Sequence, residues 1–117
     1  METLDYPFIW VRKEKEFTWY KRNALKTLWA QASHNNCILH FENGEIFIAS
    51  LSLKEFHQHV WPSALFRRWH FSFLVRRPDI ADCRWKYAIL RNGEQVPLSE
   101  KGYTKAKSYL HERDLKQ

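Results

Sequence analysis

The sequence predicts a mainly β protein whose short strands pair antiparallel, with two helices, and three observations lead to this prediction. Short runs of aromatic and β-branched residues recur along the chain and are separated by small polar turns. Two Asn-Gly pairs sit between such runs, which is the strongest short-range signal for a hairpin. No repeat or linker divides the 117 residues, so we expect one domain over residues 1–117, with one core at about residues 8–110.

The two Asn-Gly pairs predict two hairpins, at Asn43-Gly44 and Asn92-Gly93. Both central residues of a type I′ turn need positive φ, which asparagine and glycine tolerate, so we expect type I′ turns. The flanking strands are Cys37–Phe41 and Glu45–Ala49 for the first pair, and Tyr87–Arg91 and Glu94–Pro97 for the second. The other strand-like runs are Phe8–Val11, Phe17–Tyr20, Thr27–Ala30, Phe71–Val75 and Ile80–Arg84.

Two helices interrupt or follow the strands. Ser52 and Glu55 have the spacing of a capping box, and Pro62 ends the short helix that follows, which we expect to cap an open end of the sheet core. Its apolar positions are Leu53, Phe56 and Val60. A C-terminal helix is predicted from about Glu100 to Arg113, with Ser99 as its N-cap. The segment expected to fray is Asp114–Gln117.

The charge of the chain is basic and unevenly distributed. Lys and Arg number 19 against 13 Asp and Glu, a net charge of +6 at pH 7. Residues 31–66 hold one base and three acids, whereas residues 67–98 hold seven bases and three acids. A clustered basic excess favours nucleic acid or an anionic membrane surface as partner, although a soluble protein can also be basic without such a partner.

The cysteines and the apolar segments indicate in which cellular compartment the protein is expected. Cys37 and Cys83 fit neither a disulfide framework nor a closely spaced metal motif, so we expect reduced core residues. No segment resembles a signal peptide, and no apolar run approaches the roughly 20 residues that span a bilayer. We therefore expect a soluble, cytoplasmic protein that does not bind membranes.

The segment from Leu65 to Ile80 combines core and surface features. Two arginine pairs, Arg67–Arg68 and Arg76–Arg77, bracket a run of aromatic and aliphatic residues. A buried strand does not need doubled guanidinium groups at both ends, and guanidinium groups are well suited to holding phosphate.

The order of these motifs resembles the LytTR family of DNA-binding domains over roughly Phe8 to Tyr109. The matching positions are a short Leu-containing helix, Phe66-Arg67, His70, Ser72, Leu74-Val75, Ile80 and Pro97-x-Ser99. The resemblance implies an elongated domain of small antiparallel sheets, found in bacterial transcription regulators, whose loops enter the major groove and bend the duplex. A receiver domain precedes this domain in some members. The 117 residues leave no room for one, so we expect a standalone domain unless the chain is a fragment.

The resemblance implies three DNA-contacting loops, of which the first is Ser33-His34-Asn35-Asn36. His34 or Asn35 takes the base-contacting place there, since an asparagine amide can bond both edges of adenine. Asn35 and Asn36 can equally serve only to shape the turn.

The second loop contains His70, Phe71 and Ser72. Family members commonly carry a polar residue, often arginine, where Phe71 stands, and this departure removes one expected DNA contact. The arginines Arg67, Arg68, Arg76 and Arg77 can grip phosphates from either end of the segment. His70 can also be a partly buried histidine without a DNA contact.

The third loop is Ser99-Glu100-Lys101. Similar proteins have an arginine here that reaches a guanine, and Lys101 is the base available in this chain. Lysine lacks the forked geometry that makes arginine selective. Glu100 faces phosphate unless it turns back to the helix N-terminus, where its charge is favourable.

No residue pattern predicts catalysis, a bound metal or a cofactor, and we expect a binding protein rather than an enzyme. His57 and His59 lie two apart on a helix and face different directions. The expected partner is double-stranded DNA, with a second copy of the chain on paired DNA repeats and no small-molecule substrate. Two functions stay open: a sequence-specific transcription regulator, or a degenerate module for protein interaction or nonspecific nucleic-acid binding.

Overall fold

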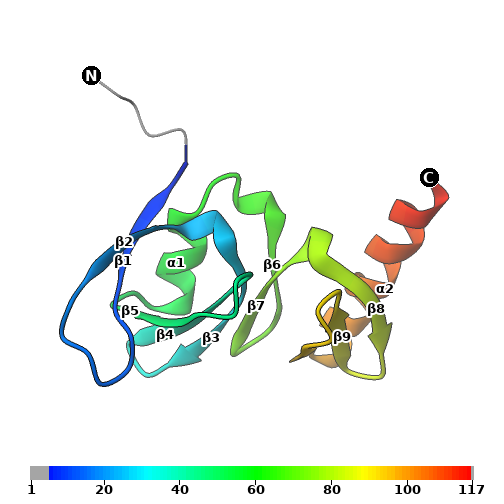
Figure 1. The fold of residues 1–117 in the computed structure, drawn as a ribbon. Coiled ribbons are helices and arrows are strands. Elements are labelled where there is room, and N and C mark those ends of the chain that lie inside the picture. Colours follow the sequence, from blue (N-terminus) through cyan, green and yellow to red (C-terminus); the bar gives the residue numbers. More distant parts are fainter. Residues whose placement is uncertain (1–5, 117) are drawn as a thin grey trace.

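A computed structural model describes residues 6–116, and the strands of this part form three antiparallel sheets (Figure 1). The first sheet pairs β1 (Phe8–Val11) with β2 (Tyr20–Asn23). The described chain measures 42 × 34 × 23 Å along its principal axes, so the molecule is elongated. No helix of this part is long and apolar enough to cross a membrane.

The central sheet has five strands in the order β5-β4-β3-β7-β6. Its strands are β3 (Thr27–Ser33), β4 (Asn36–Phe41), β5 (Ile46–Ala49), β6 (Phe66–His70) and β7 (Phe73–Arg76). Alternate residues of β4 and β5 are buried because successive side chains of a strand point to opposite faces. The buried side chains of β4 and β5 therefore lie on one face of the sheet, and the helix that follows β5 packs against this face.

Helix α1 (Leu53–His59) covers the central sheet and has the predicted capping box. The Ser52 hydroxyl accepts the Glu55 N–H at 3.1 Å, and the Glu55 carboxylate accepts the Ser52 N–H at 3.0 Å. Leu53 and Phe56 are buried, and the Phe56 ring meets Phe66 of β6 edge-on at 6.1 Å. The capping box therefore fixes the point at which the chain leaves the sheet and turns its apolar residues inward.

The third sheet is a meander of three strands covered by the C-terminal helix. Its elements are β8 (Ile80–Arg84), β9 (Tyr87–Leu90), β10 (Gln95–Pro97) and α2 (Glu100–Leu115). Short 3₁₀ turns join several elements, at Ala24–Lys26, Ser63–Leu65 and Arg77–Asp79. The expected mainly β fold with one short helix and one C-terminal helix is thereby present.

The interior is divided into two clusters rather than the one core expected from the sequence. One cluster fills the space between the central sheet, the first sheet and α1, and includes Phe47, Phe56 and Phe66. The other lies under α2 and includes Ile80 and Leu90. The division follows from the topology, because each of the two larger sheets packs against its own helix.

Helix α2 is seated on β6 through a glycine. A methyl group added at Gly102 would lie 1.8 Å from the Trp69 carbonyl oxygen, so only glycine allows this approach. The Ser99 N–H donates to the same oxygen at 2.8 Å. The start of α2 is therefore fixed against the end of β6.

Both Asn-Gly hairpins are present, but their turn type differs from the predicted type I′. Gly44 and Gly93 have φ of +89° and +91°, whereas neither asparagine is among the residues with positive φ. The Gly44 N–H donates to the Phe41 carbonyl and the Phe41 N–H to the Glu45 carbonyl, which is a three-residue connection with a type I turn and a glycine bulge. Leu90, Gly93 and Glu94 repeat this pattern in the second hairpin.

Each asparagine then bonds the glutamate that follows its glycine. The Asn43 oxygen accepts the Glu45 N–H at 2.9 Å, and its amide donates to the Glu45 carboxylate at 2.6 Å. Asn92 and Glu94 make the same two bonds at the same distances. The asparagines thus lock the turns with their side chains instead of supplying positive φ.

Two further strand predictions need correction. The second strand is Tyr20–Asn23 rather than Phe17–Tyr20, and Phe17 is 96% exposed in the connection before it. Strand β6 was not expected as a separate strand, and the predicted strand Phe71–Val75 is its partner β7, displaced to Phe73–Arg76. A register irregularity between Arg67 and His70 breaks the period of two that marks a strand in the sequence.

A set of polar side chains joins the two larger sheets, and we call it the junction: Trp29, Glu42, Arg76, Asp79 and Glu94. Arg76 is at its centre, with a side chain that is only 15% exposed. Its guanidinium donates to Asp79, to the Leu25 carbonyl and, at 2.9 Å, to Glu42. The Trp29 indole N–H donates to Glu94 at 3.1 Å. Residues far apart in the chain are thus held together across the sheets.

Candidate nucleic-acid interface

The three loops predicted to contact DNA lie along one side of the molecule. The Ala32 N–H donates to the Ser72 carbonyl at 2.9 Å, which brings the β3–β4 turn beside the β6–β7 turn. The bond from the Ser99 N–H to the Trp69 carbonyl places the start of α2 on the other side of the β6–β7 turn. In Figure 1 these turns lie on the lower side of the molecule. The structure therefore brings together loops that are more than half the chain apart.

A fourth turn extends this row, and sequence reasoning missed it. Trp85 and Lys86 form the β8–β9 turn, since Arg84 pairs with Tyr87. The Lys86 carbonyl accepts the Leu98 N–H at 2.8 Å, and the Trp85 ring meets Tyr103 of α2 at 5.1 Å. Two predicted strands separated by only two residues were the signal that could have located it. We call the four turns together the contact edge: His34-Asn35, Phe71-Ser72, Trp85-Lys86 and Ser99–Lys101.

The β3–β4 turn presents two side chains to solvent. Ser33 pairs with Asn36, so the turn itself consists of His34 and Asn35, and His34 has φ of 57°. Both side chains are exposed, and neither makes a side-chain hydrogen bond within residues 6–116. Asn36 belongs to β4 and is half-buried. Of the three polar residues predicted here, His34 and Asn35 are therefore the ones free to meet a ligand.

The β6–β7 turn is held by two side chains of β6 that bond the peptide group between Phe71 and Ser72. His70 Nδ1 accepts the Ser72 N–H at 2.9 Å, so the neutral ring carries its proton on Nε2. Arg68 donates two hydrogen bonds to the Phe71 carbonyl, at 3.2 and 2.6 Å. Phe71 itself is 84% exposed. His70 and Arg68 thus shape the turn, and the phenyl ring stands at its tip.

The start of α2 uses its predicted serine as a cap. The Ser99 hydroxyl accepts the Gly102 N–H at 2.9 Å, which satisfies one of the free N–H groups of the first turn. Glu100 and Lys101 are exposed. The negative charge of Glu100 in the first turn is favourable because it lies at the positive end of the helix dipole. Lys101 is left as the charged group that can reach outward.

The four predicted phosphate-binding arginines occupy different environments. Arg68 is exposed at the contact edge, Arg67 is half-buried in β6, and the Arg77 guanidinium lies 5.0 Å from the Tyr109 ring centre. Arg76 belongs to the junction, where Glu42, Asp79 and Leu25 take up its donors. We therefore withdraw Arg76 from the candidate phosphate contacts.

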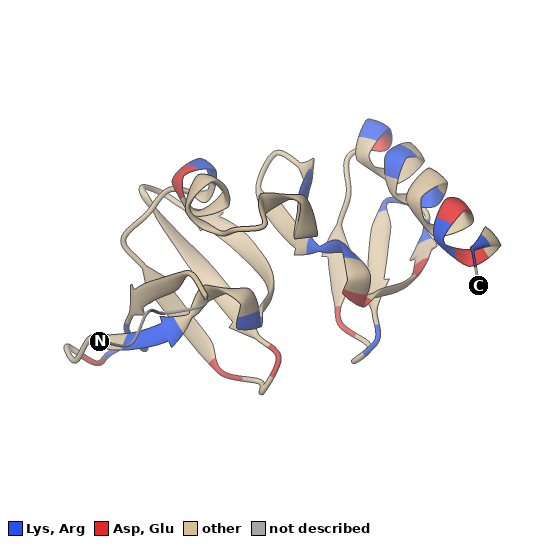
Figure 2. Cartoon of the chain, turned by 90° about the horizontal axis from the view of Figure 1, so that it is seen from above, with Lys and Arg blue, Asp and Glu red and all other residues tan. Residues whose placement is uncertain are grey.

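The junction also shifts the ionisation of Glu42. The hydrogen bond from Arg76 holds the pKa of the Glu42 carboxyl below its ordinary value, and Lys26, whose ammonium lies 3.2 Å away, adds to the effect. Figure 2 shows both signs of charge along α2, with Lys and Arg in the majority, and Asp and Glu in the hairpin turns at the lower border of the view. The acidic turns and the contact edge are thus at opposite ends of the same strands.

The two cysteines are free and sheltered. Burial raises the pKa of the Cys37 thiol to about 12 and that of the half-buried Cys83 thiol to about 11, with Asp82 adding to the second shift. Both thiols are therefore protonated at neutral pH and make poor nucleophiles and metal ligands. Within residues 6–116, no group of three acidic, histidine or cysteine side chains is placed to hold a metal ion.

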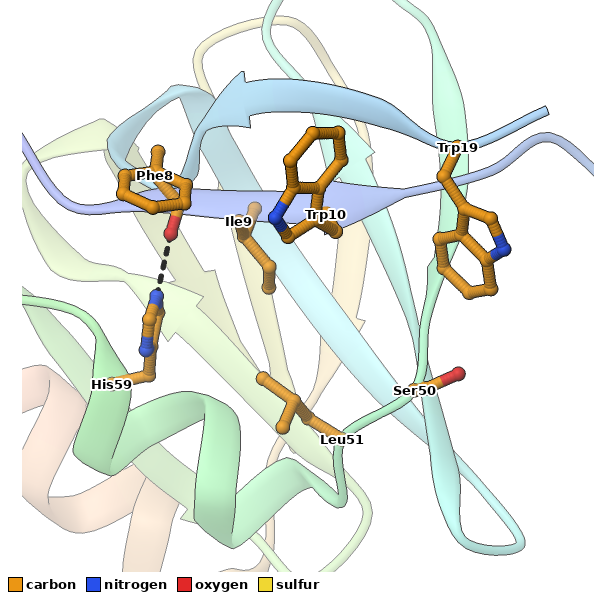
Figure 3. Close-up of a pocket in the computed structure, with 7 residues that line it drawn as sticks. All are labelled: Phe8, Ile9, Trp10, Trp19, Ser50, Leu51 and His59. Atoms are coloured by element: carbon orange, nitrogen blue, oxygen red, sulfur yellow. Dashed lines mark hydrogen bonds between the residues drawn. The ribbon is translucent and has the colours of Figure 1, made fainter.

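A hollow of about 470 Å³ lies apart from these turns (Figure 3). It is lined by Phe8, Ile9, Trp10, Trp19, Ser50, Leu51 and His59. His59 donates from Nε2 to the Phe8 carbonyl at 2.6 Å, and thereby ties the end of α1 to β1. None of the residues predicted to contact DNA lines this hollow.

The fold is similar to that of a solved structure from Bacillus cereus, described as the LytTr DNA-binding domain of a methyl-accepting/DNA response regulator. The TM-score is 0.67 with 22% sequence identity, and the alignment covers 89% of this chain and 95% of that chain. The predicted LytTR-like, mainly β fold is therefore confirmed. No protein-family model matches the sequence, and no curated protein matches it.

Proposed function

We propose that this protein binds double-stranded DNA through the contact edge and regulates transcription in the cytoplasm. The observation that carries the proposal is the gathering of four exposed turns on one side of a fold that a DNA-binding domain shares. Within residues 6–116 the side chains of His34 and Asn35 make no hydrogen bond, whereas Arg76 of the junction bonds Glu42 and Asp79. Exposed polar side chains that make no hydrogen bond within the protein are available to bond a partner.

Affinity in this proposal comes from the basic groups of the contact edge. Lys86 and Lys101 are exposed on two of its turns, and Arg68 is exposed in β6 beside a third, where it bonds the Phe71 carbonyl. Neutralising phosphates releases condensed counterions, so binding should weaken steeply with salt. These contacts position the protein on the duplex but carry no sequence information.

Sequence preference in this proposal comes from the polar turn residues. The Asn35 amide can give two hydrogen bonds to adenine in the major groove, and a histidine such as His34 can give one to a base edge. Turns are narrow enough to enter a groove about 12 Å wide. The described chain is 42 Å along its longest axis, against roughly 34 Å for one helical turn of DNA, so the domain is long enough to lie across successive major grooves.

The alternative is a module that has kept the fold and lost base readout. Phe71, where the resemblance leads us to expect a polar residue, and Glu100 beside Lys101 are the features that favour this alternative. Both functions are those of a binding protein and need neither a catalytic group nor a cofactor. A second copy on paired DNA repeats fits the first function and not the second.

Selection from a randomised duplex library separates the two. The purified chain is used for selection, and the enriched sequence is titrated against scrambled DNA at about 0.15 M salt. We expect a recurring motif bound at least about 1000-fold more tightly than the scramble. Flat enrichment with salt-sensitive binding alone would contradict sequence-specific regulation.

Asn35→Ala tests the base contact itself. We expect a loss of roughly 1–3 kcal/mol on the selected site and a smaller loss on scrambled DNA. Gln58→Ala is the matched control, because Gln58 is an exposed amide on α1 outside the contact edge. Equal losses on both DNAs would make Asn35 a positioning residue.

A further inference from the structure

Phe71 occupies the middle of the contact edge and is almost uncovered. Its turn lies between the β3–β4 turn and the start of α2, as the bonds Ala32 to Ser72 and Ser99 to Trp69 show. The residue is 84% exposed. Since single exposed apolar residues are common on protein surfaces, exposure alone does not indicate a function. What distinguishes Phe71 is how firmly its backbone is held.

The peptide group between Phe71 and Ser72 is fixed by two side chains of β6. Arg68 donates from Nε and Nη2 to the Phe71 carbonyl, and its guanidinium carbon lies 5.7 Å from the ring centre. The His70 ring accepts the Ser72 N–H of the same peptide group, so both polar atoms of this group are bonded. Because the backbone of the turn at Phe71 is already ordered, the turn loses little conformational entropy when its phenyl ring contacts a partner. Arg68 still has Nη1 without a partner in the described chain, so it can meet a phosphate beside the ring.

Phe17 provides the comparison within the same molecule. It is even more exposed, at 96%, but lies in the β1–β2 connection, outside the contact edge. No side-chain hydrogen bond to its backbone occurs within residues 6–116. The two phenylalanines therefore share exposure and differ in placement and in support.

We propose that Phe71 is a specificity-determining residue that reads the C5-methyl group of a thymine in the major groove. This proposal rests on the proposed DNA binding. Among the groups that base pairs expose in the major groove, the thymine methyl is the apolar one, and phenylalanine is among the side chains that pack against it. A polar residue at this tip would instead read a donor or acceptor.

The test removes the methyl group without changing hydrogen bonding. Each thymine of the selected site is replaced in turn by deoxyuridine, and binding is measured for the wild type, Phe71→Ala and the control Phe17→Ala. We expect one thymine per bound chain whose replacement weakens wild-type binding about fourfold, the factor given by burial of one methyl group. Phe17→Ala should keep this effect, whereas Phe71→Ala should lose it.

A second substitution restores the methyl on another base. At the identified position, a C·G pair is compared with 5-methylcytosine·G, which differ by the methyl group alone. The wild type should bind the methylated pair about fourfold more tightly, and Phe71→Ala should bind both equally. Phe71→Leu keeps an apolar side chain, and should retain part of the preference if Phe71→Ala binds too weakly to titrate.

The failures of the two proposals are distinguishable. A selected motif whose deoxyuridine effects are the same in the wild type and in Phe71→Ala would overturn the methyl contact and leave sequence-specific binding intact. If no motif is selected, sequence-specific binding fails and the methyl contact fails with it.

Discussion

The strands that carry the contact edge at one end carry the junction at the other, and the two ends are built differently. At the junction, Arg76 donates to Glu42 and Asp79, and Trp29 donates to Glu94. At the contact edge, the side chains of His34 and Asn35 have no such partners within the described chain. The same β4 and β7 strands connect both ends, so the difference does not come from the strands.

This difference separates two uses of charged residues that look alike in sequence. Arg68 and Arg76 both belong to doubled arginines in one segment. Arg68 is exposed beside the β6–β7 turn, and Arg76 is 15% exposed and hydrogen-bonded to Glu42, Asp79 and the Leu25 carbonyl. A guanidinium that joins internal acids stabilises the fold, and one left at the surface is available to phosphate.

The strongest disturbance of the contact edge should come from Gly102→Ala. The added methyl would lie 1.8 Å from the Trp69 carbonyl oxygen, which is backbone and cannot swing away. We expect a loss of roughly 3 kcal/mol or more of unfolding free energy, since overpacking against backbone forces α2 to move. Urea unfolding measures it. An Ala106→Gly variant on the same helix is the control for helix propensity, and equal stability of Gly102→Ala and the wild type would contradict the seating of α2 on β6.

Arg76→Ala should break the junction and leave the contact edge intact. Removing the guanidinium leaves Asp79 and Glu42 without their partner, and we expect a loss of roughly 2–4 kcal/mol in urea unfolding. The folded variant should bind DNA with an unchanged salt slope. Arg91→Ala, at an exposed arginine in the second Asn-Gly hairpin, should change stability far less. If Arg76→Ala instead kept its stability and reduced the slope of log affinity against log salt, Arg76 would be a phosphate contact.

Acid should weaken the junction through Glu42. The hydrogen bond from Arg76 depresses the pKa of this carboxyl in the folded state, so the stability it contributes is present above the unfolded pKa. That contribution is lost as pH falls through the lower folded value. We expect the unfolding free energy of Glu42→Gln to fall less with decreasing pH than that of the wild type. Identical pH profiles for the two proteins would argue against this coupling.

The smallest effect is expected for a single phosphate contact. Arg68→Ala should weaken binding to all duplexes alike and reduce the slope of log affinity against log salt by about one unit. Lys54→Ala on α1 is the matched control, since Lys54 is exposed but outside the contact edge. A slope that changes in both variants, or in neither, would show that Arg68 makes no distinct phosphate contact.

Local signals predicted most of the fold. The capping box at Ser52 and Glu55 placed α1, and the Asn-Gly pairs placed two hairpins, because each depends on residues a few positions apart. The turn type was wrong since the Asn43 side chain bonds Glu45 and needs no positive φ. Strand β6 was missed because its register irregularity breaks the alternation of buried and exposed residues.

The candidate site was less predictable because it depends on contacts between distant residues. Arg76 meets Glu42 across 34 positions of the chain, and Trp29 meets Glu94 across 65. Periodicity in the sequence predicts local strands and helices, and does not predict hydrogen bonds between residues so far apart in the chain. The resemblance located three turns of the contact edge but not their fourth neighbour, Trp85-Lys86, whose place beside α2 follows from the packing of the third sheet.

The sheltered thiols make this chain convenient for attaching probes. Maleimide and iodoacetamide reagents react with thiolates, and the pKa values of Cys37 and Cys83, about 12 and about 11, leave almost none at neutral pH. A cysteine introduced at an exposed position such as Lys54 should therefore be labelled alone, with both native cysteines left in place. A dye there and another on the duplex would report, by energy transfer, the orientation in which the protein lies along its site.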